Sequence, residues 1–118
     1  MSHPTTRPAV TLYLAGPMSG LPDDNYPAFH AATAQLRAAG YTVINPAENG
    51  QPYHAALTDH MRANITNLCR SATAVALLPG WRDSQGARLE RHIASQLGMP
   101  CLPAHMWIDL AHALRAGG

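Results

Sequence analysis

The stretch that decides the fold runs from residue 72 to residue 90 and reads ATAVALLPGWRDSQGARLE. Its first part, Ala72–Leu78, is the most uniformly apolar run in the chain and predicts a strand that is buried on both faces. Turn-forming residues follow, and a helical pattern then begins near Ser84 and continues to Leu97, where Gly98 ends it. A strand, a loop and a helix in this order predict an α/β fold, and the loop after such a strand is the usual place for a functional site.

Glu90 lies on the apolar side of this predicted helix. At about 100° per residue, one sector of the helix holds Glu90 together with apolar side chains, namely Ala87, Leu89, Ile93, Ala94 and Leu97. A carboxylate that faces a core is costly unless it is paired, hydrogen-bonded or used in chemistry. A Glu at the edge of the apolar sector can instead reach solvent, so the helical pattern alone leaves both interpretations of Glu90 open.

The composition indicates a small globular domain that binds a small ligand. The chain has 118 residues, of which 47% are hydrophobic and 13% are charged. We expect a flexible segment at residues 1–9 and a single domain at residues 10–118. The formal net charge is +1, which gives no electrostatic reason to expect binding to nucleic acid or to an acidic membrane surface. Because no segment resembles a signal peptide or approaches the roughly 18 apolar residues of a membrane span, we expect a cytoplasmic protein.

The cysteine and histidine patterns do not indicate a metal site. Cys69 and Cys101 are far apart in the sequence and lie among apolar residues, so we expect free, buried thiols in a reducing compartment. The histidines lack the ligand spacing and carboxylate support of a zinc site; they are His3, His30, His54, His60, His92, His105 and His112. We therefore expect no metal and no cofactor.

The other segments alternate between strand and helix. Short strands are predicted at Val10–Ala15, Tyr41–Ile44 and Pro100–Leu102. Helices are predicted from Pro27 to Gly40, from between Tyr53 and Asp59 to about Ser71, and from Trp107 to Ala116. This alternation predicts a Rossmann-like (flavodoxin-like) α/β three-layer sandwich, in which helices cover both faces of a four- or five-stranded, mostly parallel sheet.

Three loops are candidates for the walls of a pocket. The first strand is followed by a Gly-rich loop that consists of Gly16, Pro17, Met18, Ser19 and Gly20. Its backbone N–H groups can approach an anion or a sugar, but it lacks the GxGxxG fingerprint and a Walker lysine, and a plain tight turn is the alternative. The next loop carries Asp23, Asp24 and Asn25, which can touch a ligand but are by default solvated turn residues. Ala47–Pro52 is polar and is a candidate lid or pocket edge.

Two motifs together resemble a known family. The first covers residues 12–17, LYLAGP, at the end of the first strand, and the second covers residues 84–90, SQGARLE, at the start of the predicted helix. In combination they resemble the nucleoside 2-deoxyribosyltransferase superfamily, and within it the compact bacterial and phage branch. The chain is also similar to the 2′-deoxynucleoside 5′-monophosphate N-glycosidases. The resemblance spans roughly residues 10 to 102 in the order of elements.

The resemblance implies roles for several residues. Glu90 matches the nucleophile that attacks the anomeric carbon of the deoxyribose, and Tyr13 matches a tyrosine beside the sugar. Ser84 stands where the monophosphate N-glycosidases have a phosphate-contacting serine and the transferases have an aspartate, which favours a nucleotide substrate. Gly86 and the Gly-rich loop, residues 16–20, are then expected around the phosphate and the sugar.

Elementary chemistry supports these roles independently. Ser84 and Gly86, at a helix N-terminus, offer a hydroxyl and unpaired N–H groups to a phosphate, although Ser84 can also serve as a plain N-cap. Glycosidic cleavage passes through an oxocarbenium-like state, which a nearby carboxylate such as Glu90 stabilises or traps covalently.

The chain also departs from the family pattern. The family has an aspartate early in the helix before the third strand, and the nearest match here is Asn64, an amide that cannot transfer a proton as a carboxyl group can. Asp59, His60 or Asp83 is a possible substitute. Ser19 occupies the position of an arginine that the family has in the first loop.

Two functions from different classes follow from this pattern. The first is cleavage of the N-glycosidic bond of a 2′-deoxynucleoside 5′-monophosphate, by hydrolysis or deoxyribosyl transfer, with Glu90, Tyr13 and Asn64 as the catalytic candidates. The alternative is a nucleotide-binding or sensor module that uses the same pocket without turnover. The apolar helix from Trp107 to Leu114 and the small size of the chain further predict a homodimer.

Overall fold

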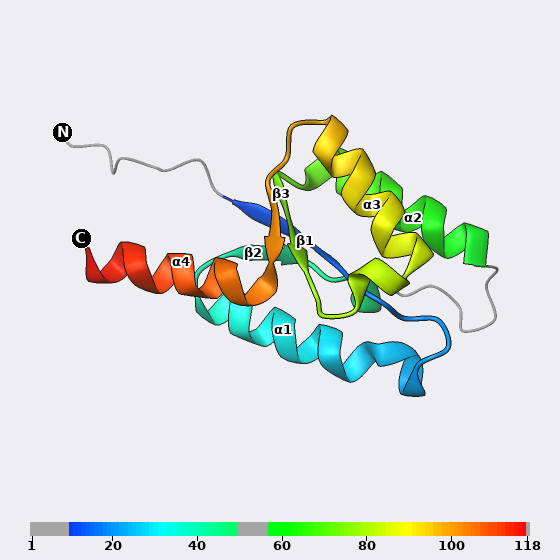
Figure 1. The fold of residues 1–118 in the computed structure, drawn as a ribbon, viewed down its shortest axis with the longest axis horizontal. Helices are drawn as coiled ribbons and strands as arrows, with labels where there is room; N and C mark the ends of the chain where they lie inside the picture. Colours follow the sequence, from blue (N-terminus) through cyan, green and yellow to red (C-terminus); the bar gives the residue numbers. More distant parts are fainter. Residues whose placement is uncertain (1–9, 50–56, 118) are drawn as a thin grey trace.

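A single parallel sheet forms the centre of the protein. The structure is a computed structural model that describes residues 10–49 and 57–117. Its strands are β1 (Thr11–Ala15), β2 (Thr42–Ile44), β3 (Ala74–Leu77) and β4 (Cys101–Pro103). All neighbouring strands are parallel, in the order β2-β1-β3-β4 (Figure 1). The predicted flavodoxin-like arrangement is therefore confirmed, with four strands.

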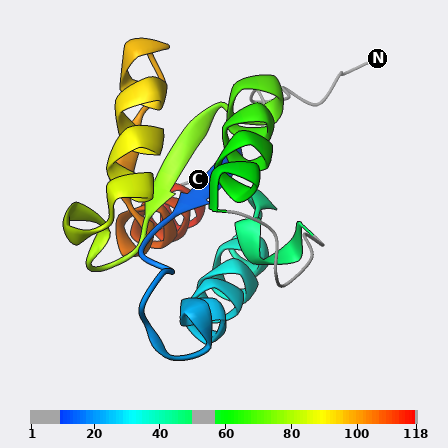
Figure 2. The same cartoon turned by 90° about the vertical axis from the view of Figure 1, so that its right-hand side faces the viewer.

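Four helices cover the two faces of this sheet. They are α1 (Tyr26–Ala38), α2 (Leu57–Ser71), α3 (Gln85–Gln96) and α4 (Ala104–Ala116). Helices α1 and α4 lie on one face, and α2 and α3 lie side by side on the other (Figures 1 and 2). Short 3₁₀ turns precede or follow them at η1 (Pro22–Asn25), η2 (Pro46–Glu48) and η3 (Trp81–Asp83).

The alternation of side chains along the strands divides the core into two layers. In β1, Leu12 and Leu14 pack toward α1 and α4, whereas Tyr13 and Ala15 pack toward α2 and α3. Every residue of β3 is buried, as its apolar run predicts, because it is a central strand covered on both faces. The side chain of Tyr13 is thereby directed toward the layer that contains α3.

The chain connections open a crevice between β1 and β3. From β1 the chain passes through α1 to β2 on one side, whereas from β3 it passes through α3 to β4 on the other side. Neighbouring strands whose connections diverge in this way form the topological switch point at which α/β proteins usually bind ligands. The loops after β1 and β3 meet at this point.

Some expectations about exposure and boundaries were wrong. Leu89 is 43% exposed and Leu97 is 57% exposed, because Leu89 borders an open cavity and Leu97 lies at the C-cap, beyond the last turn of α3. Cys69 is exposed rather than buried, since it lies on the outer side of α2, and Cys101 is half-buried. Helix α4 begins at Ala104, three residues before the predicted start, directly after its N-cap residue Pro103.

Some predicted segments lie outside the described residues. These are the N-terminal segment at residues 1–9 and positions 50–52 of the polar loop. Ala47 and Glu48 belong to η2. Within the described ranges, no helix is long and apolar enough to cross a membrane.

Candidate functional site

A cavity of about 510 Å³ lies where the loops after β1 and β3 meet. Its walls come from the Gly-rich loop, from η1 and the start of α1, from α2 and from the first turns of α3. A volume of this size lies within the usual range for small-molecule sites. The switch point of the sheet and the cavity therefore coincide, as the order of strands requires.

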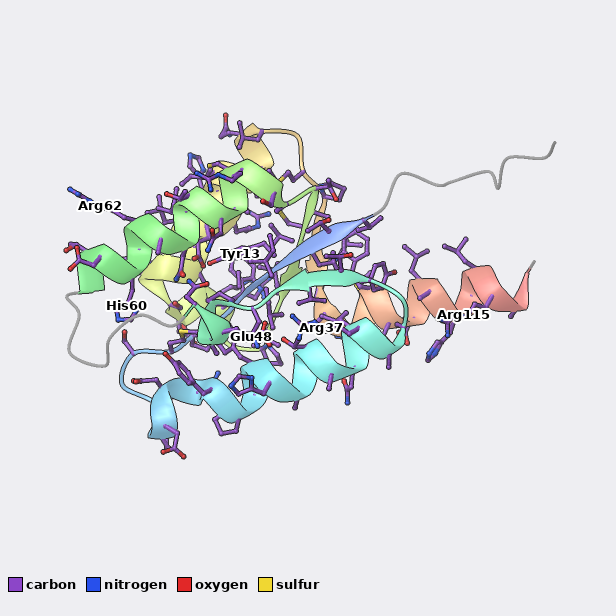
Figure 3. All side chains as sticks on the ribbon, turned by 180° about the vertical axis from the view of Figure 1, so that it is seen from behind. Tyr13, Arg37, Glu48, His60, Arg62 and Arg115 are labelled. Carbon is purple, nitrogen blue, oxygen red and sulfur yellow. The ribbon has the colours of Figure 1, made fainter. Side chains whose placement is uncertain are left out.

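Glu90 and Tyr13 form a buried pair at this cavity. Glu90 is 4% exposed and lines the cavity from α3, and Tyr13 is completely buried on β1. The Tyr13 hydroxyl donates a hydrogen bond of 2.5 Å to Glu90 Oε2. Figure 3 shows Tyr13 in the interior, between the sheet and the layer of α2 and α3. Of the two interpretations of Glu90, the inward one is therefore correct, and its partner is Tyr13, which the resemblance places beside the sugar.

Burial changes the protonation of both members of the pair. Loss of hydration raises the pKa of Glu90 to about 7, although the hydrogen bond from Tyr13 favours the carboxylate and opposes this rise. Burial, and then the charge and hydrogen bond of Glu90, raise the pKa of Tyr13 well above its usual value. Tyr13 therefore remains a hydroxyl donor at neutral pH, while Glu90 exchanges its proton near neutrality.

Replacing Glu90 with Gln is expected to stabilise the protein above pH 7. Since the folded-state pKa of Glu90, about 7, exceeds its usual value of 4.5, the folded state binds more protons than the unfolded state between these limits, and wild-type stability falls as pH rises through them. The Gln variant does not titrate, so it should gain up to about 3 kcal/mol over the wild type at pH 8 compared with pH 4.5. Urea unfolding at both pH values measures this difference. An equal difference at the two pH values would contradict the raised pKa.

The N-terminus of α3 contributes unpaired backbone donors to the cavity. Ser84 caps the helix, with its Oγ accepting a hydrogen bond of 3.2 Å from the Ala87 N–H, and Ser84 also lines the cavity. The N–H groups of Gln85 and Gly86 belong to the first turn and have no acceptor within the helix. Gly86 packs closely against α2: a Cβ there would lie 3.2 Å from Met61 Sδ, so the Met61 side chain would have to shift by a few tenths of an ångström.

The Gly-rich loop after β1 is fixed by packing as well as by its turn. A Cβ at Gly16 would lie 2.7 Å from the Leu78 Cβ, so this glycine allows β1 and the end of β3 to approach closely. Asn25 Nδ2 donates to the Pro17 carbonyl oxygen at 2.8 Å and holds the loop in place. All but one residue of the loop line the cavity; the exception is Gly20, which supplies a turn with φ +83°.

Of the polar residues proposed around the site, the structure brings some to the cavity and not others. Asn64, His60 and Asp83 line it, whereas Asp59 is exposed and does not. Figure 3 shows His60 and Arg62 on α2, with Arg62 pointing away from the molecule. Asp24 is exposed, as expected of a solvated turn residue, and it also lines the cavity.

The backbone of η1 explains how Asp24 reaches the cavity. Asp23, Asp24 and Asn25 all adopt left-handed conformations, with φ between 51° and 60°. Asp and Asn tolerate this region better than most residues, so the chain makes a left-handed turn here directly before α1 begins at Tyr26. Such a run of positive φ values leaves no periodic pattern in the sequence, and the turn could not be predicted from it.

The charge on the cavity wall is acidic. Its described lining contains the carboxyl groups of Asp24, Asp83 and Glu90 and no Arg or Lys. Within the described ranges, no three His, Cys, Asp or Glu side chains are grouped so that they could hold a metal ion. A bound phosphate would therefore depend on neutral donors, namely the N–H groups and the hydroxyl at the start of α3.

Comparison with known families matches residues 10–102 to a domain of unknown function, DUF4406. The chain belongs to this family. The match covers β1 through most of β4 and includes every residue that lines the cavity. A comparison with proteins of curated function found no match. The evidence for the chemistry of this DUF4406 domain therefore lies in the cavity itself.

Proposed function

We propose that this protein cleaves the N-glycosidic bond of a 2′-deoxynucleoside 5′-monophosphate, by hydrolysis or by deoxyribosyl transfer. The observation that carries the proposal is the buried Glu90–Tyr13 pair at the cavity wall, next to the unpaired N–H groups that begin α3. The resemblance to the nucleoside 2-deoxyribosyltransferase superfamily supports the same roles. The parallel α/β fold of the DUF4406 domain is consistent with this resemblance.

The proposed reaction assigns the central step to Glu90. Its carboxylate oxygen forms a bond to the anomeric carbon as the bond from that carbon to the base nitrogen breaks, and the bonding electron pair leaves with the base. Tyr13 holds the other carboxylate oxygen and so directs the attacking one toward the cavity. Water, or a second base, then displaces Glu90 from the sugar.

The presence of acid–base side chains in the cavity favours catalytic turnover over simple nucleotide binding. The alternative function is a nucleotide-binding or sensor module, which needs no acid in the cavity. His60 and Asp83 both line the cavity, and both are residue types that enzymes use as general acids. Incubation with a panel of ribo- and deoxyribonucleoside monophosphates, followed by chromatography for free base, tests the proposal. Binding without release of any base would support the alternative.

Ser84→Ala is expected to weaken monophosphate binding by about 10-fold and nucleoside binding by less than about twofold, because only the phosphate uses the Ser84 hydroxyl. Calorimetric titration with a matched nucleotide and nucleoside measures both losses. Since Ser84 also caps α3, Ser84→Asp is the paired variant: it keeps a capping oxygen but adds a charge that repels the phosphate. Equal losses for nucleotide and nucleoside would count against a phosphate site.

The exposed stripe on α4 supports a homodimer. Met106, Leu110 and Leu114 are 42–45% exposed and recur every four residues, so they form one apolar stripe on a helix whose last turns extend beyond the sheet (Figure 1). A two-fold axis would bring this stripe against the same stripe of a second copy. Sedimentation should show a dimer that Leu110→Glu converts to a monomer. Leu97→Glu, at the exposed C-cap residue of α3, is the control, and a monomeric wild type would exclude the dimer.

A further inference from the structure

Three asparagine side chains form a hydrogen-bonded chain that ends at the cavity. Asn67 Nδ2, on α2, donates to Asn49 Oδ1 at 3.3 Å, and Asn49 Nδ2 donates to Asn64 Oδ1 at 2.6 Å. An amide accepts only through its oxygen and donates only through its nitrogen. Because Asn49 accepts from Asn67, its NH₂ group must face Asn64, and Asn64 is left with its own NH₂ group uncommitted.

The residue that carries this free NH₂ group lies on the wall of the cavity. It lies one turn after His60 on α2 and lines the cavity from that side, whereas Glu90 lines it from α3. Among the described residues, no group accepts a hydrogen bond from Asn64 Nδ2. Its direction is set by Asn49, which follows η2 and lies 15 residues before it in the sequence.

We propose that Asn64 recognises a carbonyl oxygen of the nucleobase and that Asn49 is the positioning residue that keeps the Asn64 NH₂ group directed at it. This inference rests on the proposed function, because it concerns the base of the same nucleotide. A fixed N–H donor stabilises a carbonyl group but leaves an amino group, itself a donor, without a partner. The cavity therefore selects keto bases over amino bases at the edge where the two differ.

The same contact gives Asn64 a role in the reaction that does not involve proton transfer by Asn64. When the bond between the anomeric carbon and the base nitrogen breaks, the electron pair enters the base, and part of the negative charge collects on its carbonyl oxygen. An N–H donor that already points at this oxygen stabilises the charge as it develops. An amide at position 64 is then suited to a keto base, and the proton that completes the free base comes from elsewhere, such as water, His60 or Asp83.

Binding to matched nucleotide pairs tests the inference. The probes are 2′-deoxyuridine and 2′-deoxycytidine 5′-monophosphates, and 2′-deoxyinosine and 2′-deoxyadenosine 5′-monophosphates; each pair differs in carbonyl against amino at one exocyclic position and in the adjoining ring nitrogen, which carries a hydrogen only in the keto base. Calorimetry on the Glu90→Gln protein measures binding without cleavage. We expect the keto member of each pair to bind about 10-fold more tightly. Adding Asn64→Ala should reduce this ratio to within about twofold.

Changing Asn49 separates positioning from simple structural support. Asn49→Asp can no longer donate to Asn64, so the Asn64 amide should turn, donate to the new carboxylate and direct its oxygen at the cavity. The preference should then invert in favour of the amino bases, which a loss of structure would not produce. Asn49→Ala should abolish the preference without inverting it. Thr66→Ala, at an exposed position of α2 whose hydroxyl donates to the Arg62 carbonyl oxygen, should leave the ratio unchanged.

The outcomes distinguish this inference from the proposed function. If no probe binds, both the proposed function and this inference fail. If the probes bind but the keto and amino members bind equally, or if Asn64→Ala leaves the ratio unchanged, the assignment of Asn64 is overturned and the proposed function stands. If Asn49→Asp only lowers all affinities together, Asn49 has no positioning role.

Discussion

Replacing Glu90 with Gln is expected to lower the rate of base release from a 2′-deoxynucleoside 5′-monophosphate by about 10³-fold or more. The amide has the shape of the carboxyl group but carries no charge, so it neither attacks the anomeric carbon nor stabilises an oxocarbenium-like state. The fold should remain intact, because the Gln oxygen can still accept the hydrogen bond that Tyr13 now donates to Glu90 Oε2. Chromatography of free base over time, with substrate in excess, measures the loss.

The matched control for this variant is Glu48→Gln. Glu48 is exposed and forms the 2.8 Å ion pair with Arg37 at the surface, where such pairs contribute little (Figure 3). Base release by this control should equal that of the wild type. Undiminished release by Glu90→Gln would remove Glu90 as the nucleophile and leave the buried pair without a catalytic role.

Replacing Tyr13 with Phe is expected to slow base release by about 10-fold or more and to move its pH dependence upward. The carboxylate is the reactive form of Glu90, so the activity of the wild type should rise with pH through a pKa of about 7. The Tyr13 hydrogen bond favours that carboxylate, and its loss raises the pKa of Glu90 further. The acid limb of kcat/KM should therefore lie roughly one pH unit higher in the variant.

Tyr41→Phe is the control for the Tyr13 variant. The Tyr41 hydroxyl donates to the Trp107 carbonyl oxygen at 2.7 Å, in the layer formed by α1 and α4, and Tyr41 does not line the cavity. Its loss should leave the pH profile unchanged. An acid limb that stays in place in Tyr13→Phe would show that another group controls the ionisation, and His60 would then be the first residue to replace.

The phosphate is the part of the proposed substrate that is hardest for this cavity to bind, because the carboxylates on the cavity wall repel it. Asp24 and Asp83 lie on the same cavity as the start of α3, and no described Arg or Lys lines it. The helix N-terminus must therefore compensate for two carboxylates as well as hold the phosphate. The comparison of nucleotide with nucleoside for Ser84→Ala and Ser84→Asp decides whether it does so.

Much of the local structure followed from periodicity in the sequence. The apolar run before Pro79 predicted a central strand, and the helical pattern after Ser84 placed Glu90 on its inner side. Burial within one element is encoded by the spacing of its own apolar residues, which is why these features could be predicted. The same reasoning failed for Leu89 and Leu97, because exposure also depends on which neighbouring element covers a given turn.

The sequence by itself determined the alternation of strands and helices, the parallel sheet and the position of Glu90 on the apolar side of its helix. Only the tertiary structure decided that the Tyr13 hydroxyl meets this carboxylate across 77 residues of chain, and that Asn49 orients Asn64. The order of strands and the packing of α2 against α3 determine these meetings. Both contacts join residues of different elements, and the periodicity within a single element does not predict such contacts.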